Sequence, residues 1–208
     1  MFVRFCGRRY GRLILERVRG IPVIVFPGVF HPLLFLSTSL LLDALEEFEL
    51  KADSSVLDVG TGTGICAVFS AIRGAQVTAV DISPFAVRCA RANVIINCVE
   101  DKVRVLEGDL FSPVEGETFD LVIFNPPYYK GKPRSWAEYA WRSENVMDRF
   151  IESLPNHLAR GGRALLALST ELDLRAIQEK LVARGFKVRE MRRRRLPGET
   201  MFVYECAL

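Results

Sequence analysis

The sequence has few of the residues from which metal centres and disulfide frameworks are built. It contains five cysteines and two histidines in 208 residues. The cysteines are odd in number, no two form a Cys-x-x-Cys pair, and no His-Glu-x-x-His motif is present. We therefore expect neither a disulfide framework nor a metal site. This usage is typical of a reducing compartment, so the expected location is cytoplasmic.

Charged residues are absent from residues 20–42, a stretch as long as a membrane-spanning helix. Pro22, Pro27 and Pro32 fall in its first half and would break a lipid-exposed helix. The start of the chain also lacks the continuous apolar core and cleavage site of a signal peptide. We therefore expect no membrane span and no membrane partner.

The same stretch predicts a hairpin followed by a helix. Ile21–Phe26 and Val29–Phe30 lie on either side of a Pro27-Gly28 turn signal. Residues 37–39, Ser-Thr-Ser, can cap a helix over Leu40–Leu45.

Half of the residues are hydrophobic and a quarter are charged, which indicates one globular domain with a sizeable core. The net charge of +3 is unevenly spread, with six arginines in the first twenty residues and a run at Arg192–Arg195. Basic patches commonly contact polyanions, and they are also commonly just solvated surface. Composition alone favours the solvated surface.

From residue 55 onward, strand-like and helix-like segments alternate. The expected strands are Val56–Val59, Gln76–Val80, Val103–Glu107, Leu121–Phe124, Ala164–Leu168, Phe186–Arg189 and Thr200–Tyr204. The expected helices are Ile65–Arg73, Pro84–Asn97, Asn145–Leu158 and Leu172–Ala183. This alternation predicts an α/β fold with βαβ units on a doubly wound, mostly parallel sheet. Ligands bind such sheets beyond the carboxyl ends of the strands.

A glycine-rich loop joins the first of these strands to its helix. It carries Asp58, Gly60, Gly62 and Gly64, and Asp81 ends the next strand. Glycines let the backbone turn tightly and approach a ligand, and a carboxylate at Asp81 can accept both ribose hydroxyls of an adenosine-containing cofactor. The dinucleotide fingerprint Gly-x-Gly-x-x-Gly is met only if alanine replaces its last glycine, so NAD is disfavoured without being excluded.

The spacing of Asp58–Gly64 resembles the first motif of class I S-adenosylmethionine-dependent methyltransferases. The resemblance continues through Asp81, Gly108–Leu110 and the Leu-x-x-Gly-Gly turn of residues 158–162. It implies S-adenosylmethionine as cofactor and a seven-stranded Rossmann-like sheet with an antiparallel last strand. It also implies that residues 46–208 form the methyltransferase domain and residues 1–45 a short N-terminal extension of hairpin and helix packed on the core.

The resemblance also supplies the expected cofactor contacts, with Asp109 at the adenine amino group. They are Asp58, Gly60, Thr61, Gly62, Gly64, Asp81, Ile82, Asp109, Leu110 and Asn125.

Residues 125–128, Asn-Pro-Pro-Tyr, follow a strand that ends at the same sheet edge. The nitrogen of a planar NH2 group is a poor nucleophile because its lone pair is delocalised. The Asn125 side-chain oxygen and the Pro126 carbonyl could grip both N–H bonds and orient the nitrogen for attack. Pro126 and Pro127 would hold the turn rigid, and Tyr128 offers an aromatic face. Catalysis would come from orientation and electrostatic preorganisation.

This tetrapeptide resembles the signature of amino-methyltransferases that act on glutamine, adenine or guanine. Upstream, Val29–Pro32 and the Leu-rich helix resemble the compact branch of HemK-type glutamine methyltransferases, in which a threonine, here Thr38, lies near the cofactor. That resemblance implies a release factor or another protein as acceptor and allows for a small activating subunit. The acidic residue that precedes this threonine in the family is Ser37 here.

The alternative is an RNA or DNA base, at adenine N6 or guanine N2. Lys130, Lys132 and Arg134 follow the tetrapeptide and could contact phosphates. Trp136 and Trp141 could stack on an extruded base, as could Tyr128 or Tyr129.

Overall fold

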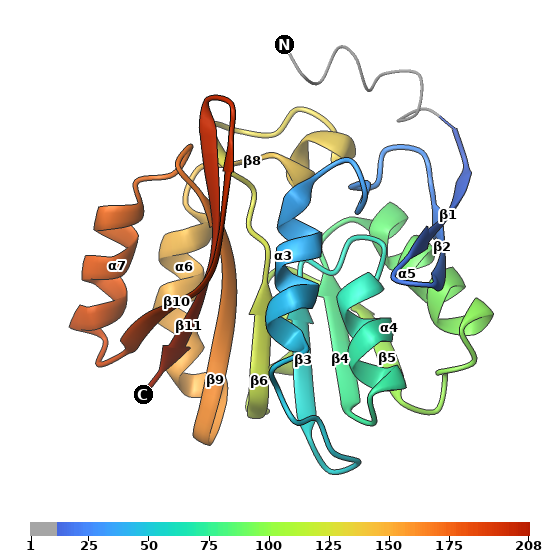
Figure 1. The fold of residues 1–208 in the computed structure, drawn as a ribbon, viewed down its shortest axis with the longest axis horizontal. Helices are drawn as coiled ribbons and strands as arrows, with labels where there is room; N and C mark the ends of the chain where they lie inside the picture. Colours follow the sequence, from blue (N-terminus) through green and yellow to red (C-terminus); the bar gives the residue numbers. More distant parts are fainter. Residues whose placement is uncertain (1–11) are drawn as a thin grey trace.

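The computed structural model describes residues 12–208, and Figure 1 shows its fold. Arg4, Arg8, Arg9 and Cys6, which entered the predictions above, lie outside this range. The strands are β1 Ile14–Val18, β2 Ile21–Val25, β3 Ser55–Val59, β4 Gln76–Asp81, β5 Val103–Glu107, β6 Phe119–Phe124, β7 Tyr129–Lys130, β8 Arg142–Ser143, β9 Leu158–Ser169, β10 Lys187–Leu196 and β11 Glu199–Ala207. The α-helices are α3 Leu36–Leu45, α4 Ile65–Ile72, α5 Pro84–Ile96, α6 Val146–Ser153 and α7 Leu174–Ala183.

Seven of the described strands form the main sheet, in the order β10-β11-β9-β6-β3-β4-β5. β3 pairs in parallel with β4 and β6, and β11 runs antiparallel to both of its neighbours. The predicted fold class, a mostly parallel seven-stranded Rossmann-like sheet with an antiparallel last strand, is confirmed. Strand order reverses between β3 and β6, where sheets of this kind leave a crevice.

Helices cover both faces of the sheet. Leu121 and Ile123 of β6 pack with α3, α4 and α5 in one core cluster, whereas Val122 and Phe124 pack with α6 and α7 in the other. In Figure 1, α3 and α4 lie in front of the central strands. Since side chains alternate across a strand, covering both faces requires a continuous apolar run, which explains the sequence of β6.

The predicted hairpin is wrong in its position. β2 pairs with β1 on its N-terminal side, and the turn is Arg19-Gly20, with φ of 53° and 83°. Positive φ at both turn residues is the geometry of a tight hairpin turn. Pro27-Gly28 also forms a turn, closed by a hydrogen bond from Val29 N to Phe26 O (3.1 Å), but no strand follows it. The sequence did not predict β1, because Ile-Leu-Glu-Arg-Val does not alternate between apolar and polar residues.

The largest differences from the predicted helix boundaries are in α3 and α6. α3 begins at Leu36, and no side chain caps it. Residues 37–39, Ser-Thr-Ser, lie inside its first turn. Ser37 accepts a hydrogen bond from Asn125 and does not cap the helix. The predicted helix over residues 145–158 ends at Ser153 and continues as a 3₁₀ turn over Leu154–His157.

The arginine run Arg192–Arg195 lies on the final hairpin, in β10. Arg192 is half-buried against α3, and residues 193–195 are all exposed. β10 is an edge strand, and its outer end extends beyond the helices that cover the rest of the sheet. In residues 12–208, no helix has both the length and the apolar character needed to cross a membrane. The division of the chain between residues 45 and 46 stays a prediction.

Candidate active site

A cavity of about 820 Å³ lies at the carboxyl ends of β3, β4, β5 and β6. This volume is within the usual range for small-molecule sites. Of the predicted site residues, the cavity is lined by Thr38, Asp58, Gly60, Thr61, Gly62, Asp81, Ile82, Asp109, Leu110, Asn125, Pro126, Pro127 and Tyr128. Gly64 is the predicted residue that does not line it. The topology therefore brings together residues that are up to 90 positions apart, between Thr38 and Tyr128.

The glycine-rich loop is built from backbone conformations that favour glycine. Gly60, Gly62 and Gly64 have φ of 63°, 58° and 79°. A Cβ atom on Gly64 would lie 3.0 Å from the Cβ atom of Ala90, so this glycine lets α4 and α5 pack closely. Gly64 has a packing role here, and the two glycines before it face the cavity.

Asp58 is a buried carboxyl group below this loop. Its Oδ2 atom accepts a hydrogen bond of 2.6 Å from the Thr61 hydroxyl. Burial raises the pKa of Asp58 from 3.8 to about 7, although the bond from Thr61 opposes this. A cation placed beside Asp58 would favour the ionised carboxylate.

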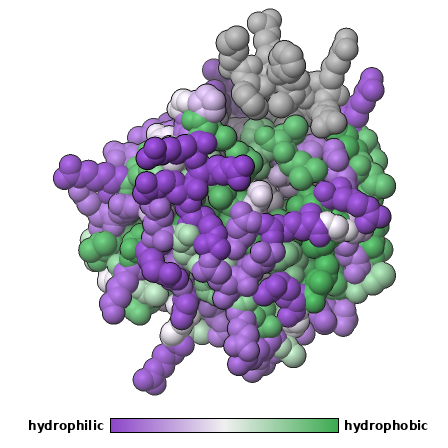
Figure 2. All heavy atoms as spheres, viewed as in Figure 1, coloured by the Kyte–Doolittle hydropathy of each residue, from purple (hydrophilic) through white to green (hydrophobic). Residues whose placement is uncertain are grey.

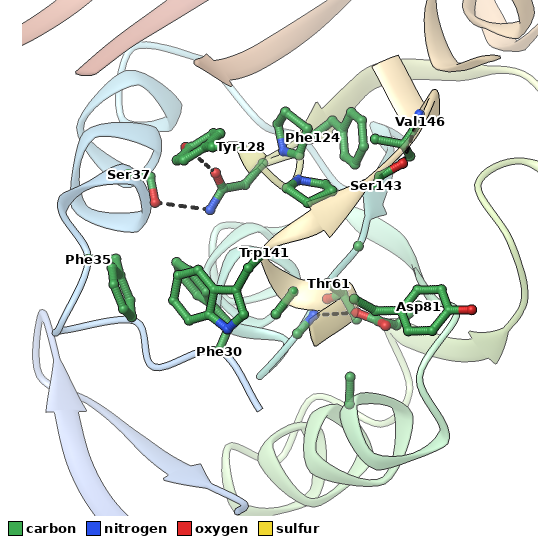
Figure 3. A pocket seen from close by; sticks show the side chains of 18 of the residues that line it. Phe30, Phe35, Ser37, Thr61, Asp81, Phe124, Tyr128, Trp141, Ser143 and Val146 are labelled. Carbon is green, nitrogen blue, oxygen red and sulfur yellow. Dashed lines mark hydrogen bonds between the residues drawn. The ribbon is translucent and has the colours of Figure 1, made fainter. Parts of the chain in front are cut away.

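Asp81 ends β4 and links the loop to the next helix. Its two carboxylate oxygens accept hydrogen bonds from the backbone N–H groups of Gly62 and Ser83, both at 2.9 Å. Burial nevertheless raises its pKa. Each oxygen has a second lone pair, so the carboxylate can also accept hydrogen bonds from a ligand. Figure 3 shows Asp81 at the edge of the cavity beside Thr61.

Asp109 lies in the turn that follows β5 and is held by an ion pair with a residue of α6. It pairs with Arg149 of α6 at 2.6 Å, and both side chains line the cavity. The next residue, Leu110, has φ of 51°, a left-handed conformation that a branched side chain rarely adopts. Such strain is concentrated at functional sites. The sequence did not single out Arg149, because only the fold places α6 beside the turn that follows β5.

Asn125 is held at both ends of its carboxamide. Its Nδ2 atom donates to Ser37 Oγ of α3 (3.0 Å), and its Oδ1 atom accepts from the Tyr128 hydroxyl (2.6 Å). Figure 3 shows these two bonds as dashed lines, one to Ser37 and one to Tyr128. The sequence suggested an aromatic face at Tyr128. The structure adds a hydrogen bond from its hydroxyl, and it also adds Ser37, which the sequence analysis considered only as a helix cap and as a departure from a family pattern.

Three aromatic rings form a wall of the cavity. Phe30, Phe35 and Trp141 have ring centroids 4.5–5.1 Å apart. Figure 3 shows Trp141 in the cavity below the Ser37–Asn125 bond. Trp141 comes from the segment after the tetrapeptide, which the short strands β7 and β8 hold across the site. The sequence predicted neither strand.

The residues at this cavity fit S-adenosylmethionine. Three carboxyl groups, Asp58, Asp81 and Asp109, come from the ends of adjacent strands, and the cofactor carries cationic, ribose and adenine groups that such residues bind. The backbone at Gly62 has open space around it, since a Cβ atom there would have no atom nearer than 3.9 Å. A ligand could therefore approach this part of the loop closely.

The sheet order, the glycine-rich loop and the acidic strand ends define an S-adenosylmethionine-dependent methyltransferase. The profile of the methyltransferase small domain family matches residues 21–193, and the chain belongs to this family. It is an enzyme of the methyltransferase class, as predicted, with S-adenosylmethionine as its cofactor.

The chain is similar to two relatives of this class and to one solved structure. It is 34% identical over 200 residues to a candidate protein N5-glutamine methyltransferase of Methanocaldococcus jannaschii, covering 92% of this chain and 97% of that protein. It is also 34% identical over 150 residues to ribosomal RNA small subunit methyltransferase C of Alcanivorax borkumensis, covering 72% of this chain and 43% of that protein. The Mtq2–Trm112 complex of E. cuniculi, which methylates the termination factor eRF1, superimposes with a TM-score of 0.66 at 24% identity, over 86% of this chain and 98% of that one.

Proposed function

We propose that the protein is an N-methyltransferase that modifies the side-chain amide of a glutamine in a protein acceptor. The observation that carries this proposal is the Asn125 carboxamide, clamped at the cavity with its oxygen available for a second hydrogen bond. The M. jannaschii relative supports glutamine as the acceptor, because it matches this chain over nearly the full length of both.

The cofactor supplies a methyl group on a sulfonium sulfur, and residues of this chain hold the cofactor. Asp81 would accept the ribose hydroxyls, and Asp109 would meet the adenine amino group, with Arg149 fixing its carboxylate. The remaining proposed contacts are Thr38, Asp58, Gly60, Thr61, Gly62, Ile82, Leu110 and Asn125.

The acceptor amide would be gripped by Asn125 Oδ1 and the Pro126 carbonyl. Among residues 12–208, no group donates a hydrogen bond to the Pro126 carbonyl, so it is free to accept one. Two acceptors that bind both N–H bonds orient the nitrogen lone pair toward the methyl group. The amide nitrogen loses a proton after transfer, so no general base is needed beforehand. The contribution of the enzyme is orientation and fixed dipoles.

Radiolabelled methyl transfer into a cell lysate, followed by digestion with either protease or nuclease, tests the acceptor class. We expect protease, and not nuclease, to release the label. Peptide mapping without acid hydrolysis should then place the label on a glutamine. Asn125→Ala should abolish transfer, while S-adenosylmethionine should still raise the Tm of the variant. Label released only by nuclease would defeat the proposal. Stabilisation of the protein by NADH but not by S-adenosylmethionine would contradict the cofactor.

A nucleic-acid base is the second candidate acceptor, and two observations favour it. The A. borkumensis relative is named for ribosomal RNA. Lys130, Lys132 and Arg134 are exposed, and their side chains form no ion pair with the described residues, although the backbone N–H of Arg134 donates to the Glu138 carboxylate at 2.8 Å. Against it, burial and the nearby carboxylates of Glu171 and Glu199 raise the pKa of Tyr129, so this side of the site also holds negative charge.

A small activating subunit is a further proposal. The E. cuniculi structure is a complex with such a partner by its title, although a likeness at 24% identity shows only the fold. Full turnover by the purified chain alone would contradict a requirement for the subunit.

A further inference from the structure

We infer that residues 129–145 form a lid whose opening sets the rates at which S-adenosylmethionine enters the cavity and S-adenosylhomocysteine leaves it. The lid follows the tetrapeptide of residues 125–128, lines the cavity and ends at α6. In Figure 1 it runs above the carboxyl ends of the central strands, around the label β8. The inference concerns the exchange of the cofactor, so it does not depend on which acceptor is methylated.

The lid has no core of its own. None of residues 129–146 is buried, although Pro126 before them and Met147 after them are. Three aromatic side chains of the lid are 38–45% exposed, those of Tyr129, Trp136 and Tyr139. Segments with few buried apolar contacts open locally at a low cost in free energy. The lid can therefore move while the sheet, the tetrapeptide and α6 stay folded.

Backbone hydrogen bonds join the two ends of the lid to each other. Tyr129 N donates to Trp141 O (2.8 Å), and Gly131 N donates to Ser143 O (3.2 Å). These residues belong to or adjoin β7 and β8, which form a two-stranded sheet separate from the main sheet. The bonds make the lid one body, but they do not fasten it to the rest of the molecule.

An aromatic latch, made of Phe30, Phe35 and Trp141, fastens the lid to the loop before α3. The Trp141 ring of the lid lies 5.1 Å from the Phe30 ring and 4.5 Å from the Phe35 ring, between centroids. Farther along the lid, Ala137 lies against the Pro27-Gly28 turn, since a Cβ atom on Gly28 would be 3.7 Å from the Cβ atom of Ala137. Closure on this side of the cavity therefore depends on contacts between two loops.

The latch lies over the part of the cavity that fits the cofactor. Phe30 Cβ is the nearest atom, at 3.9 Å, to a Cβ atom placed on Gly62 of the glycine-rich loop. Trp141 and other residues of the lid line the same cavity as Asp81 and Asp109. A cofactor held by the strand ends would lie under the lid and would pass it on the way in and out. Lids of this kind often limit the release of product.

Measuring both exchange rates tests the latch. Rapid filtration gives the association rate constant of radiolabelled S-adenosylmethionine, and displacement by excess unlabelled ligand gives the dissociation rate constants of S-adenosylmethionine and S-adenosylhomocysteine. Trp141→Ala should raise association and dissociation together by about 10- to 100-fold, because two aromatic pairs that favour the closed lid are lost. Loss of a direct contact with the cofactor would raise the dissociation rate alone.

Two variants serve as matched controls. Trp141→Phe keeps a ring in the latch and should change the rates by less than about 5-fold. Trp136→Ala removes an exposed ring that stacks on Tyr139 within the same lid, and it should change them by less than about 2-fold. Wild-type rates in Trp141→Ala, or a rise in dissociation alone, would overturn the inference.

A disulfide between the lid and the Pro27-Gly28 turn tests the motion itself. The separation of 3.7 Å between the Cβ positions of residues 28 and 137 lies within the range of natural disulfides. Gly28→Cys combined with Ala137→Cys therefore matches the required geometry, in a Cys98→Ser background that removes an exposed thiol. Residue 28 has φ of 79°, where a cysteine is strained, so Gly28→Cys alone is the control.

Protein that is loaded with S-adenosylhomocysteine and then oxidised should release it at least about 100-fold more slowly than the reduced protein. A reducing agent should restore the rate, and Gly28→Cys alone should not respond to oxidation. Equal rates in the oxidised and reduced double variant, with the disulfide verified by peptide mapping, would overturn the inference. None of these measurements needs a methyl acceptor, so the absence of a methylated glutamine would count only against the proposed function.

Discussion

At the scale of single residues, we expect Asp58 to make both the stability of the protein and its affinity for the cofactor depend on pH. The buried carboxyl group has a pKa of about 7 in the folded protein and an ordinary value of 3.8 when solvated. Between these two values the folded state holds a proton that the unfolded state has released. The free energy of unfolding therefore falls as the pH rises through this window.

Asp58→Asn should remove this part of the pH dependence. We expect the Tm of the cofactor-free wild type to fall more between pH 5 and pH 7.5 than the Tm of the variant. A difference of about 1 kcal/mol corresponds to roughly 2–4 °C for a protein of this size. Asp81, whose pKa is also raised, is present in both proteins, so the difference between them reports mainly on Asp58. Equal slopes in differential scanning fluorimetry would contradict the raised pKa.

The affinity for S-adenosylmethionine should depend on the protonation of the same carboxyl group, Asp58. A cation beside Asp58 stabilises the ionised form, so the affinity for S-adenosylmethionine should rise from pH 5.5 to pH 7.5, with release of a proton. Calorimetry in two buffers with different ionisation enthalpies measures that proton. Asp58→Asn should bind with little dependence on pH in this range, and a variant that kept the wild-type dependence would place the effect elsewhere.

At the scale of elements, Asn93 fastens the N-terminal hairpin to the cofactor loop. Its side chain is fully buried on α5. It bonds to the backbone of Ile24 in β2 through both its nitrogen (2.7 Å) and its oxygen (2.6 Å), and it donates to the Thr63 carbonyl at 2.8 Å. The Asn93 side chain thus makes the hydrogen bonds to the backbone of Ile24 that a neighbouring strand would otherwise make.

Asn93→Ala should destabilise the protein far more than its change in volume suggests. It leaves an N–H group and two carbonyls buried without these partners, and each such group costs about 1–3 kcal/mol. Allowing for relaxation, we expect a loss on the order of 3 kcal/mol and faster amide exchange in β2. Asn97→Ala is the matched control, because Asn97 is part-exposed and bonds only to the carbonyls of Pro22 and Asn93. A smaller loss in Asn93→Ala than in Asn97→Ala would contradict this account.

The sequence predicted best the elements whose own residues carry a clear local pattern. The central strands are apolar because both of their faces are buried, and the glycine-rich loop and α5, with its Ser83-Pro84 start, carry local signals. β1 was missed because its sequence, Ile-Leu-Glu-Arg-Val, does not alternate between apolar and polar residues, and β7 and β8 were missed because two-residue strands have no periodicity. The start of α3 was misplaced because Ser37 bonds to a residue that only the fold brings near.

At the scale of the whole molecule, the basic residues divide into paired and unpaired groups. Arg192 pairs with Glu47, and Arg193 pairs with Glu190 at 2.7 Å. Arg194 and Arg195 make no ion pair with any residue in the range 12–208. The adjacent residues Leu196 and Pro197 line the same cavity as Lys132. Hydrophilic side chains dominate the face that carries α3 and this hairpin (Figure 2).

Replacing both unpaired arginines by glutamine separates the two candidate acceptors. If the acceptor is a protein glutamine, we expect the double variant to change the transfer rate by less than about 3-fold at physiological salt, as surface charges contribute little. If phosphates bind there, the slope of log K against log salt for an RNA oligonucleotide should fall by about 2. Loss of transfer together with that change in slope would favour the nucleic-acid acceptor.

The sequence by itself determined the class of the protein. The βαβ alternation, the spacing of Asp58, Gly60 and Gly62, and the residues Asn125 to Tyr128 are local patterns, and local patterns set strand ends, tight turns and the chemical groups placed there. The tertiary structure alone decided how those groups are held. Ser37 and Arg149 each act on a partner 40 or more positions away, and such pairings follow from how helices pack on a sheet. No local pattern of residues encodes that packing.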